Sequence, residues 1–373
     1  MKRRFTTALV MLLAFALIIG TTAITASAET TYTSIGGSTK FVKNLVVDEK
    51  ANIPDITFSY TIRRGTAVPV TPSTIEILIS AAGGGEIGQA EFTNADTTNA
   101  ISGLPSDADP SNPTPGKKYA QKEVTITFPT TSFTKPGVYR YEVTETNDSL
   151  PGVTYDADPI RYLDVFVVAD KNDMLSVSKY VFRKAATNIG TDGKYVTNSD
   201  EKSAGYINEL TQYDFEFSKT IAGNQGDKNK RFAFTLNISG ANPGTYPVET
   251  IDVTGNPTFI TIGDGGSEEA RYSLTDGSRV KIIGLNAGAV CTVTEDAEGY
   301  TATHSLDGGE AVSGASSGTI TLADSNHSVA FTNKRDAIIP TGIIMTIAPF
   351  AIGICVFGAI IIFIISRRKR RNY

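Results

Sequence analysis

Apolar and polar residues alternate in short runs along most of the stretch between residues 29 and 335. Successive side chains of a β-strand point to opposite faces of a sheet, so such a run predicts a strand with one buried face. Threonine, valine, tyrosine and phenylalanine are abundant, and glycine and proline are scattered throughout. The stretch has roughly 310 residues, enough for two or three domains. We therefore expect an all-β protein made of β-sandwich domains.

The first 28 residues have the three parts of a secretory signal peptide. A basic segment at residues 1–4 precedes an apolar run at residues 8–19, and Ala26-Ser27-Ala28 fits the small-x-small pattern that signal peptidase cleaves. Glu29 is then the first residue of the mature chain. An uncleaved membrane anchor is the alternative, but the apolar run is short for a helix that spans a membrane. We expect residues 1–28 to direct export.

The other end of the chain also has three parts. Residues 336–342 contain a short motif, residues 343–365 form an uncharged stretch long enough for a transmembrane helix, and residues 366–373 form a basic cytoplasmic tail. The motif consists of Ile338, Ile339, Pro340, Thr341 and Gly342. It resembles the sortase sorting signals of Gram-positive surface proteins, and within these it is similar to the x-Val-Pro-Thr-Gly variant of some pilins. The resemblance implies that a sortase cysteine attacks the carbonyl carbon of the threonine, and that the glycine leaves with the membrane segment.

The composition argues against several other kinds of function. Cys291 lies on a predicted strand and Cys355 in the apolar C-terminal stretch, so the two cysteines cannot pair. The net charge is −5 and no basic stripe is visible, which argues against nucleic-acid binding. His304 and His327 lack metal-ligand spacing, so we expect neither a metal nor a cofactor. Without a nucleophile–histidine–acid set or a phosphate-binding loop, an enzyme is not expected.

The region between the two ends contains two unequal copies of one sequence pattern. Each copy opens with an aromatic residue two positions before a lysine, continues with a strand that ends in Val-Thr-Glu, and closes with an aromatic residue two positions before an asparagine. The matching segments are 41–45 and 217–221, 136–145 and 287–295, and 206–208 and 331–333. We expect domains at residues 29–209 and 210–335, with a short linker and an end-to-end arrangement.

Three polar residues of each copy fall on the face that the apolar residues define. In the second copy, Lys219 alternates in step with Phe217 and Ile221. The same parity places these residues on core-facing sides: Lys43, Glu145, Asn208, Glu295 and Asn333. Charged residues are rarely buried without partners. Strand ends that reach solvent are the alternative, but the same three residue types in the same order in both copies favour a functional cluster.

A lysine, a glutamate and an asparagine in an apolar core can condense. Burial lowers the pKa of the amine and raises the pKa of the carboxyl, so a neutral nucleophile faces a protonated acid. We expect the acid to hydrogen-bond the asparagine carbonyl and polarise it. The amine then attacks, ammonia leaves, and a Lys–Asn isopeptide bond remains. This single-turnover reaction modifies the protein itself, so it is not an enzyme activity.

The sequence resembles the major (backbone) pilins of the streptococcal T-antigen type, which carry the pilin isopeptide-linkage domain. The resemblance rests on these motifs in this order: Lys43-Asn44-Leu45, Lys135-Pro136-Gly137-Val138-Tyr139, Val143-Thr144-Glu145, Pro151-Gly152-Val153, Val293-Thr294-Glu295-Asp296 and Phe331-Thr332-Asn333-Lys334. It implies two tandem Ig-like, Cna-B-like β-sandwich domains with one intramolecular bond each. Carried over, the bonds are Lys43–Asn208 and Lys219–Asn333, promoted by Glu145 and Glu295.

The resemblance also implies polymerisation. A pilin-class sortase would join Thr341 of one subunit to a lysine of the next identical subunit, which makes a covalent fimbrium on the cell surface. Lys202 is the nearest lysine before Asn208 and Lys194 is the next, although Lys202 also fits a solvated loop lysine. Accessory pilins, peptidoglycan and host surface ligands are further partners that such a subunit would meet.

A wall-anchored adhesin or stalk protein, with isopeptide-stabilised domains but without polymerisation, is the alternative function. Stalk proteins use the same kind of domain, so the domains alone separate the two readings poorly. The pilin-like form of the Pro-Thr-Gly motif favours the pilin, as does the lack of an additional ligand-binding domain in the sequence.

Overall fold

The computed structural model describes residues 31–66, 77–79, 84–104, 115–185, 202–337 and 360–361. Nearly all regular structure in these ranges is β-strand, which confirms the all-β fold class. Within them, no helix has the length and apolar character needed to cross a membrane. The signal peptide, the motif at residues 338–342, the basic tail and all but two residues of the predicted transmembrane helix lie outside the described residues.

The first domain is a sandwich of two sheets. One sheet has the order β10-β13-β1-β8-β5 with β7 also on β8, and the other has the order β12-β11-β9-β3 with β4 also on β9. The short strands β2 and β6 pair with each other. The bounds of the strands are β1 Ile35–Asp48, β2 Ile56–Phe58, β3 Tyr60–Arg64, β4 Ile77–Ile79, β5 Glu86–Ile87, β6 Ala90–Phe92, β7 Thr98–Ala100, β8 Lys117–Phe133, β9 Gly137–Glu145, β10 Val153–Thr154, β11 Ile160–Ala169, β12 Leu175–Arg183 and β13 Gly205–Leu210; a 3-10 turn spans Ile101–Gly103.

The alternation in the sequence becomes burial between these two sheets. On β9, Tyr139, Tyr141 and Val143 are buried in the core of the domain. On β1, the alternation breaks down, because Asn44 and Val46 are buried as well as the core-facing Leu45. The strand lies between β8 and β13, and the Asn44 side chain is held by both of them: its Oδ1 accepts from Gln121 Nε2 at 2.9 Å and its Nδ2 donates to the Tyr206 carbonyl at 3.3 Å.

The second domain is built on one continuous hydrogen-bonded path of strands, β21-β20-β23-β14-β18-β15-β19-β22. The long strand β18 pairs with β14 through its second half and with β15 through its first half, so it contributes to both layers around the core. The bounds are β14 Gln212–Ala222, β15 Phe232–Ser239, β16 Gly244–Val253, β17 Phe259–Ile262, β18 Glu268–Asn286, β19 Val290–Glu295, β20 Thr301–Leu306, β21 Val312–Ser313, β22 Ile320–Thr321 and β23 His327–Lys334.

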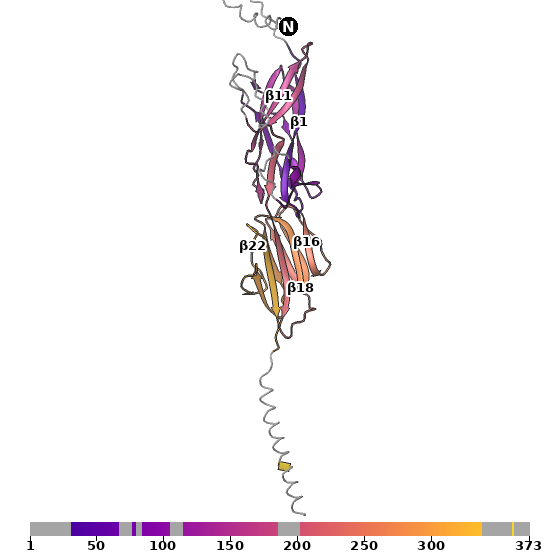
Figure 1. The fold of residues 1–373 in the computed structure, drawn as a ribbon, viewed down its shortest axis with the longest axis vertical. Coiled ribbons are helices and arrows are strands. Elements are labelled where there is room, and N and C mark those ends of the chain that lie inside the picture. Colours follow the sequence, from indigo (N-terminus) through magenta and orange to yellow (C-terminus); the bar gives the residue numbers. More distant parts are fainter. Residues whose placement is uncertain are drawn as a thin grey trace, which may run out of the picture.

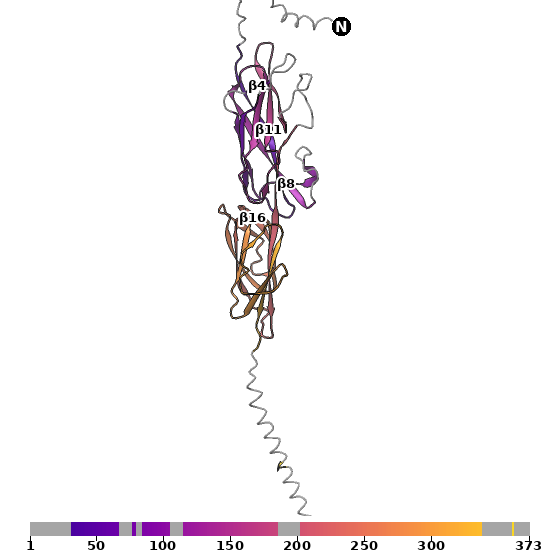
Figure 2. The ribbon, with the colours of Figure 1, turned by 90° about the vertical axis from the view of Figure 1, so that its left-hand side faces the viewer.

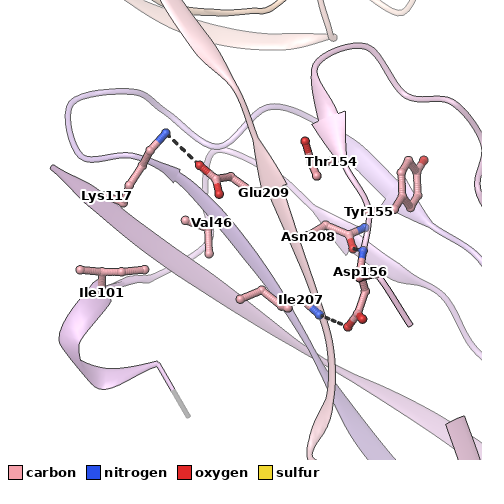
Figure 3. Close-up of a pocket in the computed structure, with 10 residues that line it drawn as sticks. Val46, Ile101, Lys117, Thr154, Tyr155, Asp156, Ile207, Asn208 and Glu209 are labelled. Carbon is pink, nitrogen blue, oxygen red and sulfur yellow. Dashed lines mark hydrogen bonds and ion pairs between the residues drawn. The ribbon is translucent and has the colours of Figure 1, made fainter. Parts of the chain in front are cut away.

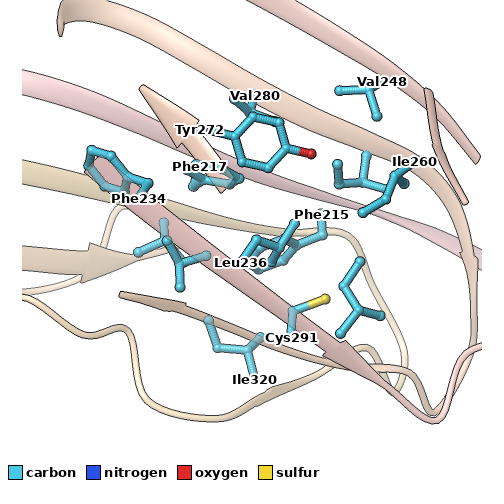
Figure 4. Close-up of a cluster of buried hydrophobic side chains, with 14 of the residues drawn as sticks. Phe215, Phe217, Phe234, Leu236, Val248, Ile260, Tyr272, Val280, Cys291 and Ile320 are labelled. Carbon is cyan, nitrogen blue, oxygen red and sulfur yellow. The ribbon is translucent and has the colours of Figure 1, made fainter. Parts of the chain in front are cut away.

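Aromatic and aliphatic side chains from these strands fill the core of the second domain (Figure 4). Phe215 and Phe217 enter it from β14, and Phe234 and Leu236 enter it from β15. Cys291 on β19 is fully buried among them. Its thiol packs as a small apolar group.

The two domains stack end to end, so the described part of the molecule is elongated (Figures 1 and 2). Thr211 alone separates β13 from β14. The first hydrophobic core extends to Leu210 and the second begins at Phe215. In each domain the first strand pairs in parallel with the last strand, β1 with β13 and β14 with β23.

Candidate functional site: a buried Lys–Glu–Asn cluster in each domain

The lysine and the asparagine of each cluster lie on neighbouring parallel strands in the same register. In the first domain, Lys43 on β1 pairs with Tyr206 on β13, and Asn208 comes two residues later on the same side. In the second domain, Lys219 on β14 pairs with Phe331 on β23, two residues before Asn333. Residues two apart on a strand share a face, so lysine and asparagine point into the same core.

The glutamate of each cluster comes from a strand that does not pair with either of these. Glu145 is the last residue of β9 and lies opposite Tyr60 on β3. Glu295 is the last residue of β19 and lies opposite Phe234 on β15. Each carboxyl group therefore reaches the lysine across the interior of its domain.

The structure brings the three side chains of each domain into contact. Lys43 Nζ lies 2.5 Å from Glu145 Oε1, and Asn208 Nδ2 donates to the same oxygen at 3.3 Å. In the second domain, the Nζ of Lys219 and the Nδ2 of Asn333 each lie 2.7 Å from Glu295 Oε1. No residue of either cluster is more than 4% exposed.

Aromatic rings surround both amines. Lys43 Nζ lies 4.5 Å from the ring centre of Phe58, and Lys219 Nζ lies 4.7 Å from the ring centre of Phe232. These rings exclude water, while their faces offer only weak stabilisation to a cation. The cluster is therefore a dry site in which ionised groups are disfavoured.

Burial changes the acid–base properties of both pairs. Desolvation lowers the pKa of Lys43 to about 8, although the nearby Glu145 opposes this change. Desolvation also lowers the pKa of Lys219. It raises the pKa of Glu145 and of Glu295, again against the effect of the partner lysine. Each shift favours the neutral amine and the protonated acid, the forms that a condensation needs.

The contact between glutamate and asparagine differs from the expected one. The sequence predicts a hydrogen bond from the acid to the carbonyl oxygen of the asparagine, whereas Glu145 and Glu295 each accept a hydrogen bond from the amide nitrogen. That nitrogen is the group that would leave as ammonia. The geometry therefore suits proton transfer from the lysine to the leaving nitrogen through one carboxyl oxygen.

Two further residues contact the first cluster and are not among those that the sequence predicts for it. The Tyr60 hydroxyl lies 3.4 Å from Glu145 Oε1, and the backbone N–H of Asp156 donates to Asn208 Oδ1 at 2.9 Å. Figure 3 shows Asp156 beside Asn208, next to a cavity of about 180 Å³. The alternation of residues 58–62 is the signal that could have placed Tyr60 on the core face, whereas no sequence signal marks the backbone of Asp156, which lies in the loop between β10 and β11.

A buried charged group also lies on the outer face of β9. Arg140 alternates with the core-facing Tyr139 and Tyr141 and so points away from the core, but it is only 2% exposed. Its Nε and Nη2 atoms donate to the two carboxyl oxygens of Asp164 at 2.7 and 2.8 Å. The chain at Gly65 passes close to Arg140, since a Cβ atom there would lie 2.6 Å from Arg140 Cγ.

The two lysines proposed to join subunits are placed differently. Lys202 is exposed and forms an isolated antiparallel bridge with Arg183, the last residue of β12. Lys194 lies outside the described residues. Among the residues that the structure describes, no group of His, Cys, Asp and Glu side chains is arranged to hold a metal ion.

Two family models match successive parts of the chain. Residues 38–198 match the Spy0128-like isopeptide containing domain, and residues 213–335 match a domain of unknown function, DUF7601. A curated pilin of Streptococcus pyogenes serotype M1 is 28% identical over 264 residues, which cover 67% of this chain and 72% of the pilin. The pilus tip adhesin Cpa of S. pyogenes is 31% identical over 131 residues, which cover 34% of this chain and 17% of the adhesin.

Solved structures share the fold. The major pilin from S. pyogenes matches with a TM-score of 0.50 and 23% identity, over 80% of this chain and 99% of that chain. The major pilin protein T3.2 of S. pyogenes serotype GAS13637 matches with a TM-score of 0.52 and 21% identity, over 80% of this chain and all of that chain. Residues 38–198 therefore match the Spy0128-like isopeptide containing domain, and the chain as a whole is similar to a pilin of S. pyogenes.

Proposed function

We propose that this protein is the backbone subunit of a surface pilus and that each of its two domains crosslinks itself by a Lys–Asn isopeptide bond. The observation that carries the proposal is the duplicated cluster, in which Lys43 and Lys219 meet a buried glutamate and asparagine in the same strand register. A structural ion pair would not need the asparagine in both copies. Amide exchange requires an amine, an acid and a primary amide in contact, and each cluster contains all three groups.

In each domain the reaction requires the neutral amine and the protonated acid, the forms that burial favours. A proton passes from Lys43 Nζ to Glu145 Oε1, and the neutral amine attacks Cγ of Asn208. A second proton from Nζ passes to Nδ2, which leaves as ammonia when the Cγ–Nδ2 bond breaks. The new Cγ–Nζ bond is a secondary amide, and one proton stays on the glutamate. The contact holds the reactants together, which replaces a bimolecular encounter by an intramolecular one.

The position of each bond supports a mechanical role. Lys43–Asn208 would join β1 to β13, and Lys219–Asn333 would join β14 to β23, the first and last strands of each domain. A pulling force that enters by the first strand and leaves by the last would then pass through the crosslink. Neither domain could be unravelled without breaking a covalent bond.

Polymerisation would proceed through the sorting motif. A pilin-class sortase would cleave after Thr341 and join it to a lysine of the next subunit, either Lys202 or Lys194. The exposure of Lys202 supports the first choice. Each subunit would be exported and held at the membrane before cleavage, and the growing fibre would be displayed on the cell surface.

The intact mass of the recombinant region 31–337 tests the isopeptide part. The mass should be lower than the sequence mass by two molecules of ammonia, one for each domain. Glu145→Ala and Glu295→Ala should each restore one molecule of ammonia, since each variant loses the proton-transferring group of one domain. An unmodified wild-type mass would refute the crosslinks.

A wall-anchored adhesin or stalk protein is the second candidate function, favoured by the match to the pilus tip adhesin. Denaturing gels of cell-wall extracts separate the two candidates. A backbone pilin should give a ladder of covalent multimers, and Lys202→Arg or Lys194→Arg should abolish the ladder if that lysine is the acceptor. A single band of monomer size would favour the adhesin.

A further inference from the structure

Asn208 is held at both ends of its side-chain amide. Its Nδ2 donates to Glu145 Oε1 at 3.3 Å, and its Oδ1 accepts from the backbone N–H of Asp156 at 2.9 Å. A backbone N–H can only donate, so this contact requires the oxygen, not the nitrogen, to face Asp156. The carbonyl group and the leaving group of the amide are thus recognised by different parts of the chain.

The second domain has no equivalent contact in the part of the chain that the structure describes. Asn333 Oδ1 is buried there and accepts no hydrogen bond, while Asn333 Nδ2 donates to Glu295 as in the first domain. The two clusters share the lysine, the acid and the asparagine. They differ at the oxygen on which negative charge would develop.

We propose that the backbone N–H of Asp156 stabilises the oxyanion during isopeptide formation in the first domain, an inference that rests on the proposed crosslinking. When Lys43 Nζ attacks Cγ, the electrons of the C=O bond move to Oδ1, and they return when the Cγ–Nδ2 bond breaks and ammonia leaves. A donor 2.7–3.1 Å from that oxygen stabilises the charged intermediate, and the Asp156 N–H already lies within this range.

The side chain of Asp156 positions this N–H group. Its Oδ2 accepts from the backbone N–H of Ile207 at 3.1 Å and from Arg161 Nη2 at 2.8 Å, and its Oδ1 accepts from the N–H of Asp158 at 3.0 Å. Figure 3 shows the contact with Ile207, the residue before Asn208 on β13. The turn that carries the donor is therefore fastened to the strand that carries the reacting amide.

Arg161, which donates to the carboxylate of Asp156, also contacts the segment that leads to Asn208. It donates from Nε to Ser203 Oγ at 3.1 Å, and its guanidinium group lies 4.8 Å from the ring centre of Tyr206. Ser203 and Tyr206 precede Asn208 on the same segment. Preorganised dipoles act in a transition state without a reorganisation cost, and these contacts supply that preorganisation.

The decisive experiment removes only the N–H group. Cell-free translation with the α-hydroxy analogue of aspartate at position 156 replaces the backbone amide by an ester and keeps the side chain. The chains are labelled in a short pulse during translation, samples are taken at intervals after the pulse, and the labelled chains are digested to measure each crosslinked peptide pair. We expect the Lys43–Asn208 bond to form about 100-fold more slowly than in the unmodified chain. The Lys219–Asn333 bond of the same molecules should keep its rate and acts as the internal control.

Side-chain variants test the positioning by Asp156. Asp156→Ala should slow the first bond about tenfold, because the turn is released but the N–H remains. Asp156→Asn keeps an acceptor for Ile207 and should restore part of the rate. Asp158→Asn changes a neighbouring exposed side chain but keeps the backbone N–H of residue 158, which donates to Asp156 Oδ1. This variant should leave the rate unchanged. Rates are compared only among variants that circular dichroism shows to be folded.

The outcomes separate this inference from the proposed function. If the unmodified chain forms neither bond, the crosslinking proposal fails and the oxyanion assignment fails with it. If the unmodified chain forms both bonds and the ester chain forms the first bond at the same rate, only the oxyanion assignment is wrong. A loss of rate for both bonds in the ester chain would also overturn it, because the effect would then come from folding as a whole.

Discussion

Tyr60 lies directly opposite Glu145 across β3 and β9, with its hydroxyl 3.4 Å from the carboxyl oxygen that contacts Lys43. Phe234 holds the matching position opposite Glu295 in the second domain and has no hydroxyl. Burial and the nearby Glu145 raise the pKa of Tyr60 far above its usual value, so the hydroxyl remains a donor. The two clusters thus share their lysine, glutamate and asparagine but differ in the polar surroundings of the acid.

We predict that Tyr60→Phe leaves the first crosslink intact. The contact is long, and the second domain lacks it altogether, so the hydroxyl is expected to help bury the acid and not to take part in proton transfer. The cost in unfolding free energy should be about 1 kcal/mol. Peptide mapping and thermal denaturation measure the two effects. Loss of the Lys43–Asn208 peptide would show that the hydroxyl is required for the reaction, and Phe234→Tyr serves as the reverse substitution.

Removing the second crosslink should destabilise the second domain selectively. Asn333→Ala prevents a bond that would close a loop from residue 219 to residue 333, and a link over a loop of about 100 residues stabilises by about 4–5 kcal/mol. Cys291 reports the opening of this domain, because its thiol is fully buried and burial raises its pKa to about 12. We expect thiol labelling of region 31–337 to become much faster in Asn333→Ala.

Two controls belong to this measurement. Asn208→Ala removes the crosslink of the other domain and should leave the labelling rate of Cys291 close to that of wild type. Asn237→Ala changes an exposed asparagine on β15 and should have no effect. Equal labelling of wild type and Asn333→Ala would mean that the second domain is not crosslinked or that the link does not limit its opening.

The stability of an uncrosslinked first domain should depend on pH in the alkaline range. In Asn208→Ala the amine of Lys43 stays free, with its folded-state pKa lowered from 10.5 to about 8. Between these values the unfolded chain binds more protons, so the free energy of unfolding should rise with pH. The raised pKa of Glu145 has the opposite sign and acts at lower pH, where stability should fall as pH rises from 4.5.

Denaturant unfolding at pH 8 and near pH 10.5 checks this prediction. In crosslinked wild type the nitrogen of Lys43 is an amide and does not titrate, so the alkaline rise should be missing. Subtracting the wild-type change removes the contributions of the other lysines, which both proteins share. An Asn208→Ala variant whose midpoint is the same at both pH values would show that Lys43 keeps an ordinary pKa.

Gln212 should couple the two domains. Its Nε2 donates to the carbonyl of Gly284 at 2.8 Å, and its Oε1 accepts from the N–H of Asp48 at the end of β1 at 3.2 Å. Gln212→Ala leaves these buried groups without their partner, which costs about 1–3 kcal/mol for each group. We expect calorimetry of this variant to show two unfolding transitions whose midpoint temperatures lie further apart than those of wild type. Gln225→Ala, an exposed glutamine far from the junction, is the control, and an unchanged trace for Gln212→Ala would contradict the coupling.

The sequence could predict which face of each strand is buried, because side-chain direction alternates along a strand with a period of two. That rule alone put Lys219 beside Phe217 and Ile221, and all three are buried. It also indicated that lysine, glutamate and asparagine share an interior in each domain. The rule is local, so it needed no knowledge of how the strands pair.

Only the tertiary structure decided which atoms meet. Parity could not show that Glu145 contacts the nitrogen of the Asn208 amide, or that the N–H of Asp156 faces its oxygen, because both depend on the packing of one sheet against the other. For the same reason it could not predict that Arg140 is buried on the outer face of its sheet. The alternation in the sequence determined which side chains enter each core, and the distance and tilt between the layers determined the chemistry that they can perform there.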